Sequence, residues 1–184
     1  VFLRPTTRVC HGYASIMVKD ETEYTHHQPE GFIKDSKRWV IFPRLSFMNH
    51  KKIEARNQEL SDVFSSYEKN KIHPSCDAFK DSKKGIATGG ISYTYTMETL
   101  KKTGMVKTLK IATPHPFPEK LAVDFLSGLD EVLCLEELDP VIERELIYIC
   151  GKYHLPTRIN GKLSGHTACA GENTRDTITT YINT

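Results

Sequence analysis

Hydrophobic and polar positions follow two different patterns along the 184 residues of the chain. From Gly85 onward, short apolar runs alternate with segments in which apolar residues recur every three or four positions, and the unit repeats about every twenty residues. This alternation is typical of βαβ units. The sequence therefore predicts an α/β fold, in which helices cover both faces of an open, mostly parallel sheet to make three layers.

The pattern places strands and helices in turn after Gly85. A continuous apolar run from Val132 to Leu135 is typical of a strand buried on both faces. The tail from Pro156, rich in glycine, threonine and asparagine, reads as a loop that ends in a short amphipathic turn. The predicted strands are at 85–88, 105–112 and 132–138, and the first predicted helix is at 92–102. A second helix is predicted to begin at 118, and its inward residues are Leu121, Phe125 and Leu129. A third helix is predicted after 140, and its inward residues are Ile142, Leu146, Ile149 and Tyr153.

Glycine, proline and aspartate mark the expected helix ends. Gly104 follows the first helix as a C-terminal stop, and Pro118 suits the first turn of the second. For the third helix, Asp139 is the expected N-cap, Pro140 the first-turn residue, and Gly151 a point of fraying.

The first part of the chain has a different pattern, in which short apolar pieces alternate with charged, turn-rich ones. From Arg44 to Asn70 the apolar residues form one narrow stripe on a charged helix, as in helices that bridge domains. We therefore expect residues 1–79 to be the exit of a preceding domain plus an irregular and helical linker, and 80–184 to be an α/β domain. The opening without methionine suggests an excised piece.

Composition excludes several function classes. With 39% hydrophobic residues, 26% charged residues and a net charge of +2, the chain resembles an ordinary soluble protein, so no nucleic-acid partner is expected. No apolar run approaches the ~20 residues of a membrane helix, so no membrane partner is expected either. Five cysteines without regular spacing, of which Cys134 and Cys150 lie in apolar elements, argue against disulfides and favour the cytoplasm.

The adjacent glycines Gly89 and Gly90 form the most distinctive corner of the chain. Glycine permits a sharp turn there, which leaves free backbone N–H groups at the start of the next helix, near Ser92 and Tyr93. The segment TGGISY lacks the spacing of a dinucleotide fingerprint. The corner could bind an anion, but a turn that packs the helix on the sheet is the favoured interpretation.

Two carboxylates, Glu136 and Glu137, follow the most apolar strand directly. They should therefore lie at the carboxyl edge of the sheet, where open α/β sheets bind ligands. Proton transfer and metal binding are both conceivable chemistries for a pair of carboxylates. Because neighbouring strand residues point to opposite faces, contact with a partner domain is favoured over catalysis.

Three weaker candidates remain. Two His and Cys pairs share a spacing that could supply a zinc site, namely His73 with Cys76 and His166 with Cys169. This signal is weak, so metal binding is not expected. The adjacent His26 and His27 are interpreted as part of a solvated turn. Arg8 and His11, beside Thr6 and Thr7, could face an anionic substrate, although hydrogen bonding at a domain crossing is favoured.

The motifs resemble those of one known family. The corner from Thr88 to Tyr95, the segment from Lys110 to Lys120 and the stretch from Glu136 to Glu143 resemble, in order, motifs of the alpha subunit of indolepyruvate ferredoxin oxidoreductases, within the 2-oxoacid:ferredoxin oxidoreductases. The opening LRPTTRVCHGY and the later RWVIFP resemble that family's exit from its pyrimidine-binding domain. Gly90, and His115 to Phe117, depart from the family pattern.

The resemblance implies a thiamine diphosphate enzyme that decarboxylates an aryl pyruvate, reduces ferredoxin through iron-sulfur clusters and forms an acyl-coenzyme A. This chain would contribute the domain similar to the C-terminal domain of transketolase, which is catalytically silent alone. It would need no cofactor itself, whereas thiamine diphosphate, magnesium and the clusters would belong to the full enzyme. Its partners would be the remaining domains of the same subunit and a second subunit.

Two alternatives stay open from the sequence. The same domain could belong to a pyruvate or 2-oxoglutarate ferredoxin oxidoreductase, because the aryl pocket would lie elsewhere. The chain could also be a free-standing α/β module that binds an anion or a protein at the glycine corner.

Overall fold

The computed structural model describes residue 3 and residues 10–184. The chain divides into two compact units, Val1–Leu45 and Ser46–Thr184. The boundary between these units differs from the predicted domain boundary between residues 79 and 80. The predicted boundary concerns the domains of the family and stays a prediction. The short helices η1 (Glu21–Glu23) and α2 (Ser36–Trp39) belong to the first unit.

The second unit is built on a five-stranded sheet in the order β1-β3-β2-β4-β5. β1 pairs antiparallel with β3, and every other pair is parallel. The mixed, mostly parallel sheet confirms the predicted fold class. Its strands are β1 (Lys71–His73), β2 (Lys84–Gly89), β3 (Lys107–Ile111), β4 (Glu131–Leu135) and β5 (Arg158–Asn160).

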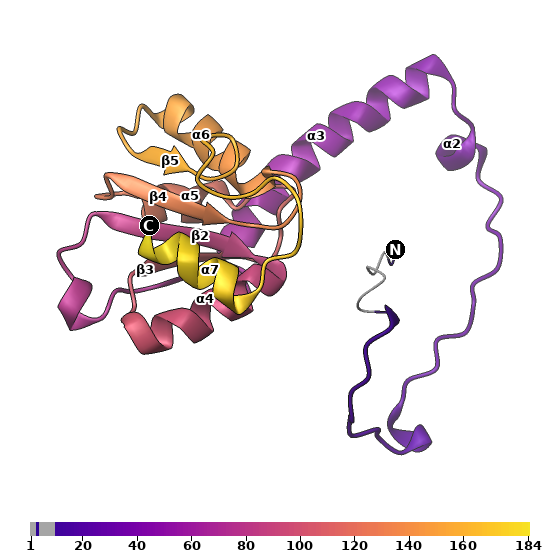
Figure 1. The fold of residues 1–184 in the computed structure, drawn as a ribbon. Helices are drawn as coiled ribbons and strands as arrows, with labels where there is room; N and C mark the ends of the chain where they lie inside the picture. The colour runs from indigo at the N-terminus through magenta and orange to yellow at the C-terminus, as the bar shows by residue number, and fades with distance from the viewer. Residues whose placement is uncertain (1–2, 4–9) are drawn as a thin grey trace. The chain divides into compact units, whose positions relative to one another are not determined.

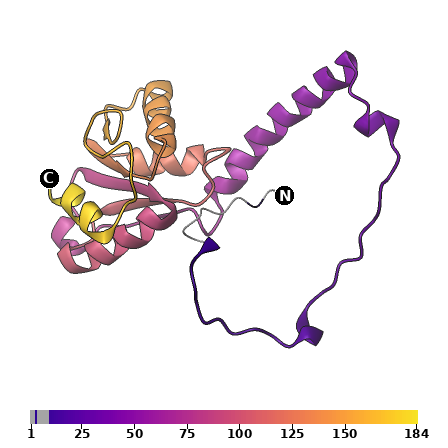
Figure 2. The same ribbon diagram turned by 45° about the vertical axis from the view of Figure 1, so that its right-hand side comes forward.

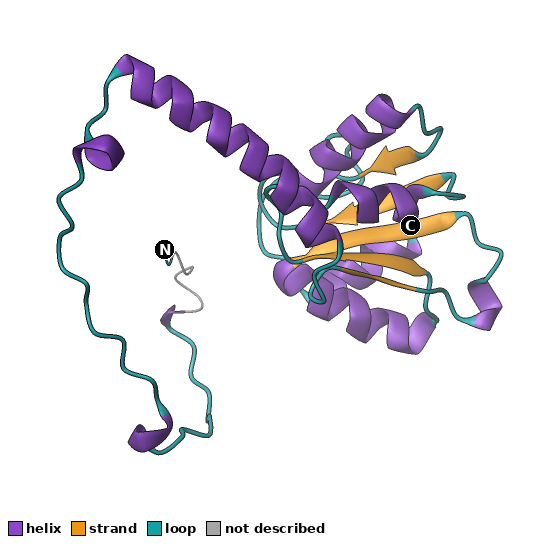
Figure 3. Ribbon diagram, turned by 180° about the vertical axis from the view of Figure 1, so that it is seen from behind, coloured by secondary structure: helices purple, strands orange, loops and turns teal. Residues whose placement is uncertain are grey.

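Helices cover both faces of this sheet, as Figures 1 and 3 show. α4 and α7 lie side by side on one face, which Figure 2 shows from a second direction, while α5 and α6 cover the other. The expected three layers are therefore present. The helices are α3 (Pro43–Ser65), α4 (Gly90–Thr103), α5 (Glu119–Leu126), α6 (Val141–Tyr153) and α7 (Arg175–Asn183), with a short η2 (Asp77–Phe79).

The core has two parts because successive strand residues point to opposite faces. Ala87 of β2 belongs to the larger cluster under α5 and α6, with Phe125 and Leu146. Its neighbour Ile86 belongs to the smaller cluster under α4 and α7, with Leu100. Cys134 and Cys150 are buried in the larger cluster, as predicted.

The elements β1, β5 and α7 were not predicted from the sequence. β1 and β5 each have three residues with one apolar side chain, too few to show a period, and they form because β3 and β4 offer free edges. The predicted short final turn is the nine-residue helix α7. Thr174 and Thr177 form its capping box, and Ile178 anchors it in the core.

Several predicted ends were also wrong. β4 ends at Leu135, so the two glutamates lie beyond the strand. α6 does not fray at Gly151 but ends at Tyr153, where His154 adopts a left-handed φ of 54°. Tyr153 is 44% exposed and not part of the core, because its hydroxyl donates to Glu119 of α5.

The long helix α3 ends at Ser65, five residues earlier than predicted. Asn70 explains this end, because its side-chain amide donates to the Phe64 carbonyl at 2.9 Å and its oxygen accepts the Ala112 N–H at 2.6 Å. The chain thereby turns toward β3. Near the end of α3, the Ser61 hydroxyl donates to the Phe117 carbonyl at 2.6 Å and joins the helix to the domain. Within the described residues, no helix combines the length and the apolar content needed to cross a membrane.

Candidate functional site

The topology of the sheet creates one switch point. β3 and β4 both pair with β2, on opposite sides. The chain leaves β2 into α4 on one face of the sheet, and it leaves β4 into α6 on the other face. Open α/β sheets have a crevice at such a point, outside the carboxyl ends of the strands.

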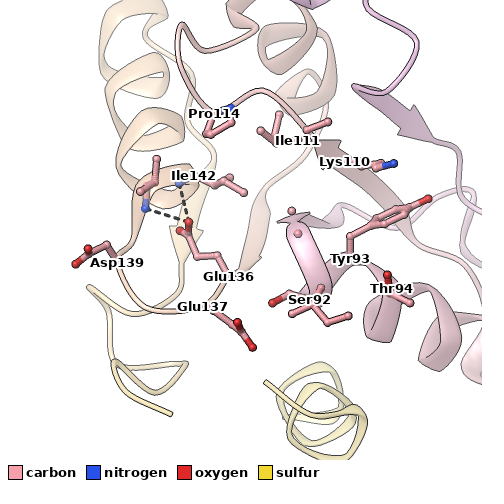
Figure 4. Close-up of a pocket in the computed structure, with 15 residues that line it drawn as sticks. Ser92, Tyr93, Thr94, Lys110, Ile111, Pro114, Glu136, Glu137, Asp139 and Ile142 are labelled. Carbon is pink, nitrogen blue, oxygen red and sulfur yellow. Dashed lines mark hydrogen bonds between the residues drawn. The ribbon is translucent and has the colours of Figure 1, made fainter. Parts of the chain in front are cut away.

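A cleft of about 730 Å³ lies at this position, and Figure 4 shows its lining. It is bounded by the carboxyl ends of the three central strands and by the first turns of α4 and α6. The tertiary structure therefore brings together six residues that the sequence singled out from two distant segments: Gly89, Gly90, Ser92, Tyr93, Glu136 and Glu137.

The two glycines are needed for different reasons. A Cβ on Gly89 would lie 2.7 Å from the carbonyl oxygen of Ile111 and 3.2 Å from Cδ1 of Ile142, so β2 packs too closely there for a side chain. Gly90 has open space around it but a φ of +57°, in the left-handed region that favours glycine. Together they let α4 begin directly at the end of β2.

Ser92 and Tyr93 are both engaged with other parts of the domain. Ser92 is buried, and its hydroxyl accepts a hydrogen bond from the side-chain amide of Asn173 at 2.9 Å. The Tyr93 hydroxyl lies 3.0 Å from Nε2 of His73, and Nζ of Lys110 lies 4.5 Å from the centre of the Tyr93 ring. Burial, and next the charges of Lys71 and Lys110, lower the pKa of His73, so its ring is neutral at neutral pH.

Glu136 is the N-terminal cap of α6. One of its oxygens accepts the backbone N–H groups of Val141 at 3.0 Å and Ile142 at 2.9 Å, and the other accepts that of Glu143 at 3.0 Å (Figure 4 marks two of these bonds). The predicted cap, Asp139, makes no side-chain capping bond, because Pro140 occupies the N-cap position. The prediction that Asp139 caps this helix is therefore wrong.

The environment of Glu136 shifts the pKa of its carboxyl group. The residue is only 7% exposed, and this burial raises its pKa. Hydrogen bonds from the three backbone N–H groups lower this pKa, whereas the nearby Glu143 raises it further. Because both oxygens are committed to the helix, the carboxylate is held in place as a structural group.

Asn173 connects the two sides of the cleft and was missed from the sequence. Its backbone N–H donates to the Glu137 carboxylate at 2.9 Å, while its side chain reaches Ser92. It precedes the cap Thr174, so both bonds hold the start of α7 against the cleft. A polar residue in a glycine-rich loop carries no local signal for such a role.

The donor set does not suit a diphosphate. Glu136, Glu137 and Asp139 line the cleft with one lysine, Lys110, so negative charge predominates and would repel an anion. In the part of the chain that the structure describes, no three His, Cys, Asp or Glu side chains are grouped to hold a metal ion. In the two His and Cys pairs noted from their spacing, His73 contacts Tyr93, and Nδ1 of His166 contacts Ser164.

The remaining candidates lie in the first unit. Arg8 is outside the described residues. His11 is described and exposed. Their role on the substrate side or at a domain crossing stays a prediction.

Comparison with known proteins identifies relatives of this chain. No protein family model matches the chain. The indolepyruvate oxidoreductase subunit IorA of Methanothermobacter thermautotrophicus is 34% identical over 167 residues, covering 90% of this chain and 26% of that subunit. The chain is homologous to part of IorA. The IorA of Pyrococcus abyssi is 31% identical over 88% of the chain, and that of Thermococcus kodakarensis is 34% identical over 79%.

These IorA relatives confirm the family resemblance read from the motifs. The chain spans about a quarter of the length of the curated relatives it matches. Other domains therefore accompany the homologous segment in those subunits.

Proposed function

We propose that the chain is a non-catalytic interface domain of a thiamine diphosphate-dependent indolepyruvate ferredoxin oxidoreductase. The complete enzyme would convert an aryl 2-oxoacid and coenzyme A into an acyl-coenzyme A and carbon dioxide, and two ferredoxins would each accept one electron. The observation that carries this proposal is the 34% identity to an IorA subunit over 90% of the chain. The cytoplasm is the proposed location.

The chemistry of the cleft supports a structural role. Its most buried carboxylate, Glu136, is held by three backbone N–H groups, and Glu137 is bonded to Asn173. A general acid or base must be able to reach a substrate proton, whereas both oxygens of Glu136 accept backbone N–H groups of α6. The proposed sites for thiamine diphosphate, magnesium and the iron-sulfur clusters are in the remainder of the enzyme.

The rim of the cleft supports the interface. Ile91, in the first turn of α4, is 45% exposed, and Val141, in the first turn of α6, is 42% exposed. Leu138, in the loop before α6, is 66% exposed. Apolar side chains on both sides of one cleft are typical of a surface that another domain covers. We propose that a domain of the second subunit packs here.

The test uses the complete enzyme with the double change Ile91→Asp and Val141→Asp. We expect loss of subunit assembly in sedimentation, because two charges would be buried at the interface. The fraction that still assembles should keep its KM for indolepyruvate and its turnover per assembled enzyme within about twofold, since neither residue touches substrate.

The matched control is Ile147→Asp, on the outer side of α6, where the side chain is similarly exposed at 44% but does not line the cleft. Normal assembly of the double variant would overturn the interface. Lack of indolepyruvate-dependent ferredoxin reduction by the unmodified enzyme would overturn the assigned reaction.

A further inference from the structure

Residues 10–42, called the arm below, expose every one of their side chains. Apart from Tyr24, the large apolar ones fall into two clusters, which are separated by the mostly polar stretch 19–31. Met17 is 99% exposed and Ile41 is 87% exposed. The first cluster comprises Tyr13, Ile16, Met17 and Val18, and the second comprises Phe32, Ile33, Trp39, Val40, Ile41 and Phe42.

The hydrogen bonds described within the arm are local and leave the apolar side chains uncovered. Asp20 caps the short helix η1, and Asp35 caps α2. The indole N–H of Trp39 donates to the carbonyl of Ile33 at 3.0 Å, within the second cluster. Local bonds thus shape each cluster, but burial of its apolar surface requires a separate partner.

The comparison with IorA shows that the arm is shared in part with that subunit. The match to the Methanothermobacter thermautotrophicus protein leaves only a tenth of the chain unmatched, which is fewer residues than the arm contains. About three quarters of the relative's length lies outside the homologous segment. That remainder offers a large surface on the same polypeptide.

We propose that the arm docks through its two apolar clusters into hydrophobic grooves on the part of the same subunit that lies outside this chain. A tethered segment has a high effective concentration for its own polypeptide, which favours this occupant over a second copy. Trp39 and Phe42 act as the principal anchors, since buried aromatic side chains dominate such contacts. This inference rests on the proposed function, because it requires a longer subunit of the IorA type.

Limited proteolysis of the complete subunit tests the docking. Trypsin cleaves after Lys34, Lys37 and Arg38, which are exposed and adjoin Trp39. The double change Trp39→Ala and Phe42→Ala should accelerate cleavage at these sites about tenfold or more, because loss of two anchors opens the arm. The control Gln28→Ala, in the polar stretch, should leave the cleavage rate unchanged. Equal rates in both variants and the unmodified subunit would overturn the proposal.

Photo-crosslinking identifies the partner. With Phe42 replaced by benzoylphenylalanine in the complete enzyme, crosslinks within the same polypeptide but outside residues 1–184 would support the docking. Crosslinks to residues 46–184, to a second copy or to a different subunit would overturn it, as would their absence. Ferredoxin reduction measured in parallel separates the two proposals: an inactive enzyme with the expected crosslinks contradicts only the reaction, and an active enzyme with an open arm contradicts only the docking.

Discussion

The buried carboxylate of Glu136 accepts the backbone N–H of Ile142 at 2.9 Å. The same side chain also satisfies the N–H groups of Val141 and Glu143, three of the groups that a helix start leaves without partners. Glu136, which directly follows β4, thus stabilises the start of α6. The same hydrogen bonds hold the loop between β4 and α6 in place.

Replacing Glu136 should reveal this cap. We expect Glu136→Ala to lower the free energy of unfolding by about 2–4 kcal/mol, because the buried N–H groups of Ile142 and Glu143 lose their acceptor. Asp139→Ala, in the same loop, should change it by no more than about 0.5 kcal/mol, since that side chain makes no capping bond. Urea unfolding measures both values, and a larger loss for Asp139→Ala would contradict the assignment of the cap.

The pH dependence of stability should report the raised pKa of Glu136. Because burial raises this pKa above 4.5, the folded chain binds the proton more tightly than the unfolded chain. The resulting stabilisation is fully present below the unfolded-state pKa and is lost as pH rises through the folded-state pKa. Glutamine cannot ionise, so the unmodified chain should lose stability relative to Glu136→Gln as pH increases across that window.

Urea titrations of both proteins between about pH 4 and about pH 8 measure this difference. Asp139→Asn serves as the control, because its carboxylate is exposed. Parallel stability curves for the unmodified chain and Glu136→Gln would show that the pKa of Glu136 is not raised.

Two glycine substitutions should act in opposite directions. Gly89→Ala should destabilise the domain by about 1–3 kcal/mol, since its Cβ would approach the Ile111 carbonyl to 2.7 Å. Gly151→Ala should stabilise it by about 0.5–1 kcal/mol, because this helical position has open space and alanine favours a helix. Thermal unfolding distinguishes them, and a stable Gly89→Ala variant would mean that the backbones of β2 and β3 can separate there.

Glu143 should control the loop after β5. Its fully buried carboxylate accepts the backbone N–H of Lys162 at 2.8 Å and that of Leu163 at 3.1 Å. Glu143→Ala should cost about 2–4 kcal/mol and accelerate hydrogen exchange of these two amides. Glu145→Ala, on the same helix, is the control and should leave both amides protected. Unchanged exchange in Glu143→Ala would exclude this role.

Elements with a sufficient run of apolar residues could be predicted from the sequence. The continuous apolar residues of β4 indicated burial, and Val132 and Cys134 are indeed almost inaccessible. Gly104 was correctly predicted to end α4, and its φ of 107° explains why glycine stands there. β1 and β5 could not be predicted, because three residues are too few to show a period and only their neighbours make them strands.

The candidate cleft could be predicted in part. Gly89, Gly90 and Glu136 stood out because each lies where a strand ends, and the carboxyl ends of parallel strands share one edge. Their contacts could not be predicted. The bond between Asn173 and Ser92 joins residues 81 positions apart, and the bond between Asn173 and Glu137 joins residues 36 positions apart.

By themselves, the local patterns of the chain established the succession of strands and helices from Gly85 to Tyr153, the buried cysteines and the family motifs, because periodicity and turn chemistry act between near neighbours. The order of the strands, the convergence of the glycine corner with the two glutamates, and the choice of Glu136 over Asp139 as cap depend on how distant segments pack. Such contacts follow from burial and hydrogen-bond geometry in three dimensions, which no spacing along the chain encodes.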